Sequence, residues 1–157
     1  MTNDTHRHLA HIGSFHFQPL VFLTVTTKDR HRILNTPAVH QILLNTWIRS
    51  ADINGWHVGR YVIMPEHVHL FARPGRESER MSDWIKAWKS ISARKINSEF
   101  SRNGSVWQVD YFDRYVRTGE SYSEKWEYVR SNPVRAGLVN HPDDWPFQGM
   151  LCDLMFA

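Results

Sequence analysis

Two histidines stand on either side of one valine in the segment His67-Val68-His69. The flanking residues alternate as in a β-strand, so the two imidazoles share one face while Val68 and Leu70 occupy the other. Imidazoles about 7 Å apart along a strand can together hold a divalent metal ion. A pair of ordinary histidines on a solvated strand face has the same pattern, so two ligands alone leave both interpretations open.

Tyr128 belongs to a segment with helical spacing, in which Tyr122, Trp126 and Val129 form the buried stripe. At about 100° per residue, Tyr128 lies about 160° away from Trp126, which predicts that its phenol points away from the stripe. Asn132 follows one turn later on the same side, where its amide oxygen is a candidate metal ligand. A surface tyrosine and an asparagine that merely caps the helix fit this spacing equally well.

The elements that must position these side chains follow in the order strand, helix, strand, strand, helix, strand, helix. The expected ranges are a strand at 20–27, a helix at 37–54, a hairpin of 56–64 and 67–73, a helix at 82–102, a strand at 106–112, and a helix with a capping box at 121–124 that ends near 131. This order predicts an α+β fold. We expect a ferredoxin-like split βαβ, with a four-stranded antiparallel sheet, helices on one face and a C-terminal helix that carries the tyrosine.

Length and composition narrow the class of protein. The chain has 157 residues, which fits one domain over residues 1–157. Lys and Arg number 19 against 16 Asp and Glu, a balance that permits a polyanionic partner. Cys152 is the only cysteine, which excludes an intrachain disulfide and a Cys-based zinc site. No apolar run is long enough to span a membrane, so we expect a cytoplasmic protein. A histidine group in the polar N-terminal segment receives no role: His6, His8 and His11.

Basic residues gather between residues 84 and 102, where they interleave with Trp84 and Trp88. Cations for phosphates and aromatic rings for bases are typical of single-strand DNA binding, but two core tryptophans on a helix with a solvated basic face give the same pattern. The candidate phosphate contacts, including two arginines beside the tyrosine, are Lys86, Lys89, Arg94, Lys95, Arg130 and Arg135.

Two stretches resemble the signature blocks of the single-tyrosine HUH transposases, in particular the branch called REP-associated tyrosine transposases. The first stretch is YVIMPEHVHLF at residues 61–71, and the second is YVRSNPVRAGLV at residues 128–139. Weaker similarity at residues 84–95 and 107–114 extends the resemblance to a core of about 15–147.

The resemblance implies an enzyme that cuts and rejoins single-stranded DNA at palindromic repeats that fold as hairpins. It implies His67 and His69 as ligands of Mg²⁺ or Mn²⁺, Asn132 as the third ligand and Tyr128 as the nucleophile that forms a 5′-phosphotyrosine. The expected partner is single-stranded or hairpin DNA and not a membrane, with the protein acting as a monomer or homodimer. Two alternatives are a domesticated protein that binds hairpins without cleaving them and a metal hydrolase that uses water in place of the tyrosine.

Overall fold

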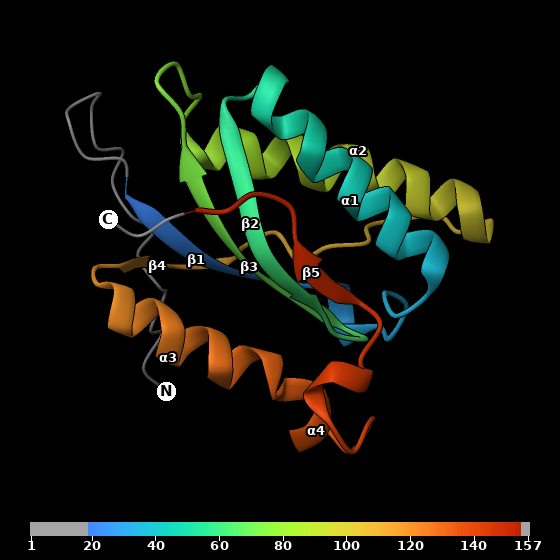
Figure 1. The fold of residues 1–157 in the computed structure, drawn as a ribbon. Coiled ribbons are helices and arrows are strands. Elements are labelled where there is room, and N and C mark those ends of the chain that lie inside the picture. Colours follow the sequence, from blue (N-terminus) through green and yellow to red (C-terminus); the bar gives the residue numbers. More distant parts are fainter. Residues whose placement is uncertain (1–18, 155–157) are drawn as a thin grey trace, which may run out of the picture.

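A computed structural model of the protein describes residues 19–154, so His6, His8, His11 and the first residues of the expected core lie outside it. The strands are β1 (Leu20–Thr26), β2 (Trp56–Ile63), β3 (His67–Pro74), β4 (Phe112–Val116) and β5 (Gln148–Met150). The helices are α1 (Pro37–Ile53), α2 (Met81–Phe100), α3 (Gly119–Arg130) and α4 (Asn132–Arg135), with 3-10 turns η1 (Lys28–Arg30) and η2 (Pro142–Asp144). The strands form one antiparallel sheet in the order β4-β1-β3-β2-β5 (Figure 1).

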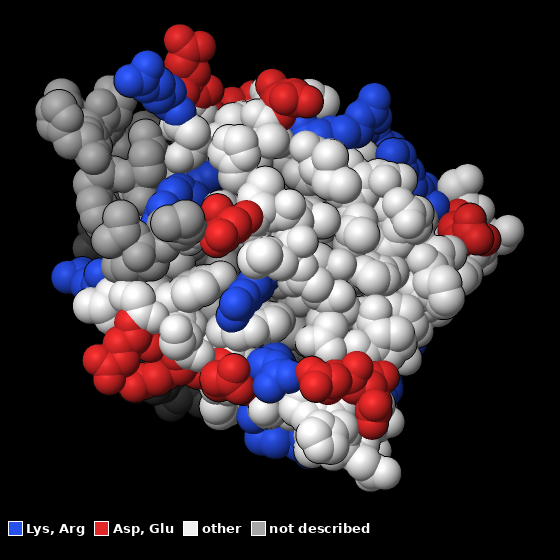
Figure 2. Space-filling view, in the orientation of Figure 1, with Lys and Arg blue, Asp and Glu red and all other residues white. Residues whose placement is uncertain are grey.

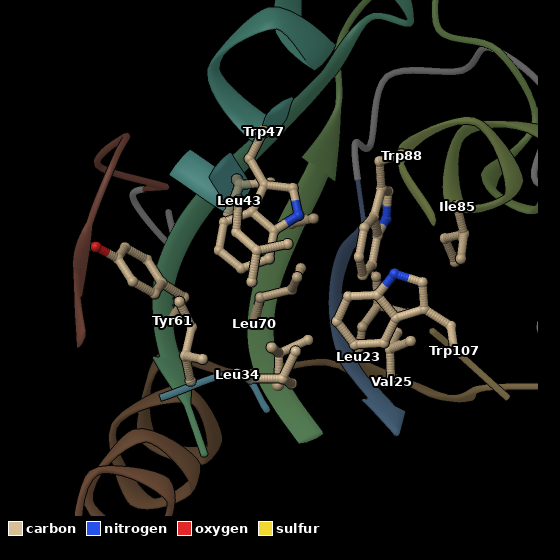
Figure 3. Packing of buried hydrophobic residues seen from close by; sticks show 14 of the residues in the cluster. Leu23, Val25, Leu34, Leu43, Trp47, Tyr61, Leu70, Ile85, Trp88 and Trp107 are labelled. Atoms are coloured by element: carbon tan, nitrogen blue, oxygen red, sulfur yellow. The ribbon is translucent and has the colours of Figure 1, made fainter. Parts of the chain in front are cut away.

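Helices cover both faces of this sheet. Alternate residues of β1 face opposite ways: Leu23 packs with α1 and α2, whereas Phe22 packs with α3. On the α1 and α2 side, Trp47 and Trp88 meet edge to face with ring centroids 5.8 Å apart, and Figure 3 shows them beside Leu70 of β3. The sheet therefore separates a tryptophan-rich core from a second, smaller core that lies under α3.

The ferredoxin-like fold is confirmed, with one strand more than the four expected. The first four strands stand in the order β4-β1-β3-β2 that this fold requires, with α1 and α2 on one face. The added strand, β5, pairs with Arg60, Tyr61 and Val62 of β2. Three residues are too few to produce a visible alternation, so the sequence pattern does not reveal β5.

The strand expected at residues 106–112 is wrong, because β4 begins only at Phe112. Val106 and Trp107 are apolar because they enter the tryptophan core, where the Trp107 indole N–H donates to Ser92 Oγ at 3.0 Å. Trp107 makes one isolated bridge to Thr27, and the chain pairs with β1 only after four further residues. Residues that pack against a helix can have the same run of apolar side chains as a short strand, which is why the sequence predicts a strand here.

The observed helix boundaries agree closely with the expected ranges, whereas the observed capping residues differ from those expected for two helices. Thr36 caps α1, and Gly55, with φ of +74°, follows its end as the Asn-Gly signal predicts. The predicted capping box at Ser121 is wrong, because α3 begins one turn earlier and Thr118 Oγ1 accepts the Ser121 N–H at 3.0 Å. The α2 helix likewise starts at Met81 without a side-chain cap. No helix among residues 19–154 has the length and hydrophobicity to cross a membrane.

Candidate active site

The histidine pair lies on β3, on the face that α3 covers. Val68 and Leu70 are fully buried in the opposite core, as the alternation predicted. His67 and His69 turn toward each other, with the two Nε2 atoms 3.0 Å apart and the ring centroids 4.6 Å apart. Alternation along one strand thus places both imidazoles on one face, where their Nε2 atoms converge.

A hydrogen-bonding side chain holds the remaining nitrogen of each imidazole. Glu66 Oε1 lies 2.9 Å from His67 Nδ1, and Thr24 Oγ1 lies 2.8 Å from His69 Nδ1. Thr24 reaches His69 because the antiparallel register of β1 and β3 places these two residues directly opposite each other. Such partners orient imidazole ligands in metal sites and leave the other nitrogen free to bind.

Both imidazoles are held in the neutral form. Burial lowers the pKa of His67, the charge of Arg30 adds to this effect, and Glu66 opposes it. Burial lowers the pKa of His69 to about 3, with further contributions from His67, Lys125 and Arg135. A neutral imidazole can offer a lone pair to a metal ion at neutral pH, which an imidazolium cannot do.

The α3 helix presents Tyr128 to solvent. Val129 is buried, while the rings of Tyr122 and Trp126 pack edge-on against Phe71 with centroids 4.7 and 6.4 Å away. Tyr128 leaves 61% of its surface exposed, so the position predicted from helical spacing is confirmed. This stripe, with Val129 buried and Tyr122 and Trp126 partly buried, fixes the rotation of the helix and thereby directs the phenol outward.

Three side chains link Tyr128 to the rest of the site. The Arg135 guanidinium stacks 3.9 Å from the centre of the Tyr128 ring and donates to the Tyr128 carbonyl oxygen at 2.6 Å. Lys125 Nζ lies 6.0 Å from the same ring and 4.6 Å from the Phe22 ring, which is stacked on His69. Burial and the charge of Arg114 lower the pKa of Lys125. Tyr128 is therefore connected to His69 through Lys125 and Phe22.

Asn132 begins α4, and its Oδ1 accepts a short hydrogen bond from Arg135. Among residues 19–154, no three His, Cys, Asp or Glu side chains gather as a metal site. The candidate metal ligands are therefore the imidazole nitrogens of His67 and His69 and the amide oxygen of Asn132, which follows Tyr128 by four residues in the sequence. The two Nε2 atoms lie together, whereas the contact of Asn132 Oδ1 is with Arg135. Two converging imidazoles with open positions around them fit a divalent metal ion whose other ligands are oxygens.

The structure separates the candidate phosphate contacts into two groups. Four of them lie on α2, over the opposite face of the sheet from the histidines: Lys86, Lys89, Arg94 and Lys95. Lys89 is engaged within the protein, since its Nζ donates to the carbonyl oxygens of Gln108 and Val109 at 2.5 and 3.1 Å. Trp84 and Trp88 are fully buried, so the core interpretation of this helix is confirmed and base stacking on these rings is excluded.

The two arginines that follow Tyr128 differ in their contacts. Arg130 forms ion pairs with Asp143 at 2.5 Å and Glu127 at 3.3 Å, so its charge is already neutralised on the surface. Arg135 instead contacts Tyr128 and Asn132, and thus positions the candidate nucleophile and ligand.

Three residues that contact or adjoin the site are not predicted by the sequence pattern. Thr24 was missed because its contact with His69 spans 45 residues and depends on strand register. Glu66 stands directly before His67, but the pattern does not reveal its hydrogen bond or its ion pairs with Arg30 and Arg32 at 3.8 and 3.6 Å. Lys125 precedes Tyr128 by three residues, and this helical spacing is a signal that could have identified it.

Comparison with known proteins gives consistent results. Residues 17–132 match the family described as Transposase IS200 like. The chain is 27% identical over 127 residues to the REP-associated tyrosine transposase of Escherichia coli, a match that covers 80% of this chain and 73% of that protein. It is 21% identical over 144 residues to a putative REP-associated tyrosine transposase of Haemophilus influenzae, covering 86% of this chain and 81% of that one.

Two solved structures share the fold. One is a REP-associated tyrosine transposase bound to a REP hairpin, with a TM-score of 0.67, 20% identity, and coverage of 89% of this chain and 82% of that one. The other is a putative transposase from Deinococcus radiodurans, with a TM-score of 0.56, 22% identity, and coverage of 78% and 97%. At these identities the likeness establishes a common architecture.

Proposed function

This chain belongs to the IS200-like transposase family, and from that premise we propose that it cuts and rejoins single-stranded DNA at hairpin-forming palindromic repeats. The single observation that carries the proposal is the exposed Tyr128, held on α3 and connected through Lys125 and Phe22 to the converging pair His67 and His69. The REP-associated relatives, one of them bound to a REP hairpin, support this class of substrate.

Tyr128 is the nucleophile of the proposed reaction. Its phenol loses a proton, and Oη forms a bond to the phosphorus of the scissile phosphodiester. The bond between phosphorus and the 3′ oxygen breaks, and that oxygen leaves with a proton as a 3′-hydroxyl. The products are a 5′-phosphotyrosine and a free 3′ end. A 3′-hydroxyl from another strand reverses the step, so strand transfer needs no nucleotide hydrolysis.

His67 and His69 would hold Mg²⁺ or Mn²⁺ through their Nε2 atoms, and Asn132 would supply the third ligand. The ion, when bound, polarises the phosphodiester oxygens and orients the scissile phosphate. Glu66 and Thr24 keep the imidazoles in the binding orientation through their Nδ1 atoms. Asn132 can join this set once Oδ1 shares or releases the Arg135 guanidinium.

The experiment that tests this function is adduct trapping on a denaturing gel. A panel of labelled hairpins with single-stranded flanks is incubated with Mn²⁺ or Mg²⁺ and wild-type protein, Tyr128→Phe or Tyr122→Phe. Tyr122 is the matched control, because it also lies on α3 but packs against Phe71. We expect a protein-linked band with wild type and Tyr122→Phe, its loss in Tyr128→Phe, and its loss in all samples with EDTA.

The other outcomes separate the alternatives. Strand cleavage that persists in Tyr128→Phe without an adduct would contradict the proposal and favour a hydrolase that activates water. Tight hairpin binding with no cleavage by wild type would instead favour the domesticated binding protein. Neither alternative has an observation of its own in the structure, and the intact set of Tyr128, His67 and His69 favours the transferase.

A further inference from the structure

Lys125 places a positive charge between the candidate nucleophile and the histidine pair. Its Nζ lies 4.6 Å from the Phe22 ring centre and 6.0 Å from that of Tyr128. Phe22 stacks on His69 with ring centroids 5.4 Å apart, and the charge of Lys125 lowers the pKa of His69. The side chain is partly buried. Lys125 thus lies between the two halves of the site, although the proposed chemistry above gives it no task.

In the described part of the chain, the ammonium of Lys125 has no hydrogen-bond acceptor. Within residues 19–154 it forms no ion pair with a carboxylate, and its contacts are the two aromatic rings. Of the cations near Lys125, Arg135 donates to the oxygens of Tyr128 and Asn132, and Arg114 stacks on Phe112 with its guanidinium 5.4 Å from the ring centre. An ammonium carries three donors and, away from bulk water, binds an anionic oxygen more strongly than an aromatic face.

We propose that Lys125 binds a non-bridging oxygen of the scissile phosphate and holds the phosphorus between Tyr128 and the histidine pair. This inference rests on the proposed function and makes Lys125 a catalytic residue of it. Negative charge on the non-bridging oxygens must be accommodated while the bond from Tyr128 Oη forms and the bond to the 3′ oxygen breaks. A fixed cation at that position lowers the barrier because it is already oriented before the reaction.

A purely structural role for Lys125 makes a different prediction. In that case its charge would serve only to attach α3 to β1 through the Phe22 ring. Lys125→Met keeps an unbranched apolar stem against Phe22 and removes the charge, whereas Lys125→Arg keeps the charge. A substrate that lacks the negative charge at the scissile position distinguishes phosphate binding by Lys125 from a purely structural role, because only phosphate binding depends on that charge.

The test measures binding in the Tyr128→Phe background, in which the strand stays intact. The scissile linkage, mapped beforehand with wild type, is either a phosphodiester or an uncharged methylphosphonate. With EDTA present, so that no metal ion contacts the same oxygens, we expect the methylphosphonate to weaken binding by Tyr128→Phe about tenfold and to leave binding by Tyr128→Phe/Lys125→Met unchanged. The matched control is Tyr128→Phe/Lys86→Met, in which the lost charge lies on α2 and the penalty should persist.

A rate measurement completes the test. In single-turnover adduct formation, Lys125→Met should slow the reaction about 100-fold, Lys125→Arg should retain most of the rate, and Lys86→Met should equal wild type. Thermal unfolding verifies that each variant is folded. An equal methylphosphonate penalty with and without Lys125, in a protein that forms adducts, would overturn the role of Lys125 alone. Absence of any adduct from wild type would overturn the proposed function and this inference with it.

Discussion

The hydroxyl of Thr24 can serve either tautomer of His69, because it can donate to Nδ1 or accept from it. Glu66 is an acceptor, so His67 donates from Nδ1 and keeps a lone pair on Nε2. In the hydrogen bond between the two Nε2 atoms, His69 is then the donor, and Thr24 donates to its Nδ1. If both Nε2 atoms bind a metal ion, the His69 proton must move to Nδ1, where Thr24 becomes the acceptor. A hydroxyl can do both, which valine at this position cannot.

The buried neutral His69 should make the metal-free protein sensitive to acid. An unfolded histidine has a pKa near 6.5 and the folded His69 has one of about 3, so below pH 6.5 the unfolded state binds a proton that the native state excludes. We expect His69 to lower the free energy of unfolding by about 1.4 kcal/mol for each pH unit below 6.5.

Denaturant unfolding in EDTA at pH 7 and pH 5 measures this effect. The comparison protein is His69→Gln, which lacks the titrating group while other partly buried histidines such as His67 still contribute. Wild type should lose more stability between the two pH values than His69→Gln does. Equal losses would show that His69 is not held neutral in the native state.

At the scale of elements, α3 is the helix that carries Tyr128, the proposed nucleophile. Its contact with the sheet is modest, with Val129 as its one buried residue in the described structure. Arg60 of β2 adds to this contact, since its guanidinium lies 5.1 Å from the Trp126 ring centre and 5.6 Å from that of Tyr122. These stacked cation and aromatic groups fix the rotation of α3 about its axis, and thereby the direction in which Tyr128 points.

Removing this cation should loosen α3 without unfolding the protein. Such contacts contribute about 0.5–1 kcal/mol, so Arg60→Leu should speed amide hydrogen exchange in α3 by about threefold. Exchange in α1, on the other face of the sheet, should not change. Arg49→Leu, which removes an exposed arginine from α1, is the control. Unaltered exchange across α3 in Arg60→Leu would show that Arg60 does not hold the helix.

The whole molecule has two sides with different surfaces. The stretch from Pro37 to Ile48 in α1 and all of β5 contain no Lys, Arg, Asp or Glu, and Figure 2 shows a largely uncharged surface over these elements. Charged side chains border α3, and the basic residues of α2 belong to the helical layer behind the sheet. For the proposed reaction we therefore expect the strand to approach Tyr128 from the α3 side, because phosphates have no cation to contact on β5 or on α1 between Pro37 and Ile48.

This arrangement predicts that the exposed α2 cations do not take part in the chemistry. The triple variant Lys86→Ala, Arg94→Ala and Lys95→Ala should form the adduct with a short single strand at a rate within about twofold of wild type. Single-turnover gels over a range of salt concentrations provide the measurement. A loss of tenfold or more, reduced at low salt, would place the strand across α2 and contradict the approach from the α3 side.

Local patterns in the sequence were sufficient for part of the site. Alternation along residues 67–70 placed both histidines on one face, and helical spacing directed Tyr128 away from the apolar stripe of α3. These predictions succeeded because each depends on the geometry of a single strand or helix, which repeats over a few residues. The same periodicity led to the expected order of strands and helices in the ferredoxin-like sheet.

Tertiary structure decided everything that joins distant segments. Strand register determines the pairing of Thr24 with His69 and the addition of β5 to β2. The position of α3 against the sheet determines the contact of Lys125 with Phe22. Apolar residues indicate that a segment is buried, but they do not indicate which element it packs against. Trp84 and Trp88 therefore fitted both a hydrophobic core and a surface for base stacking. For the same reason, residues 106–112 resembled a strand. Only the packing of the whole chain, which minimises exposed apolar area across all elements together, distinguishes these outcomes.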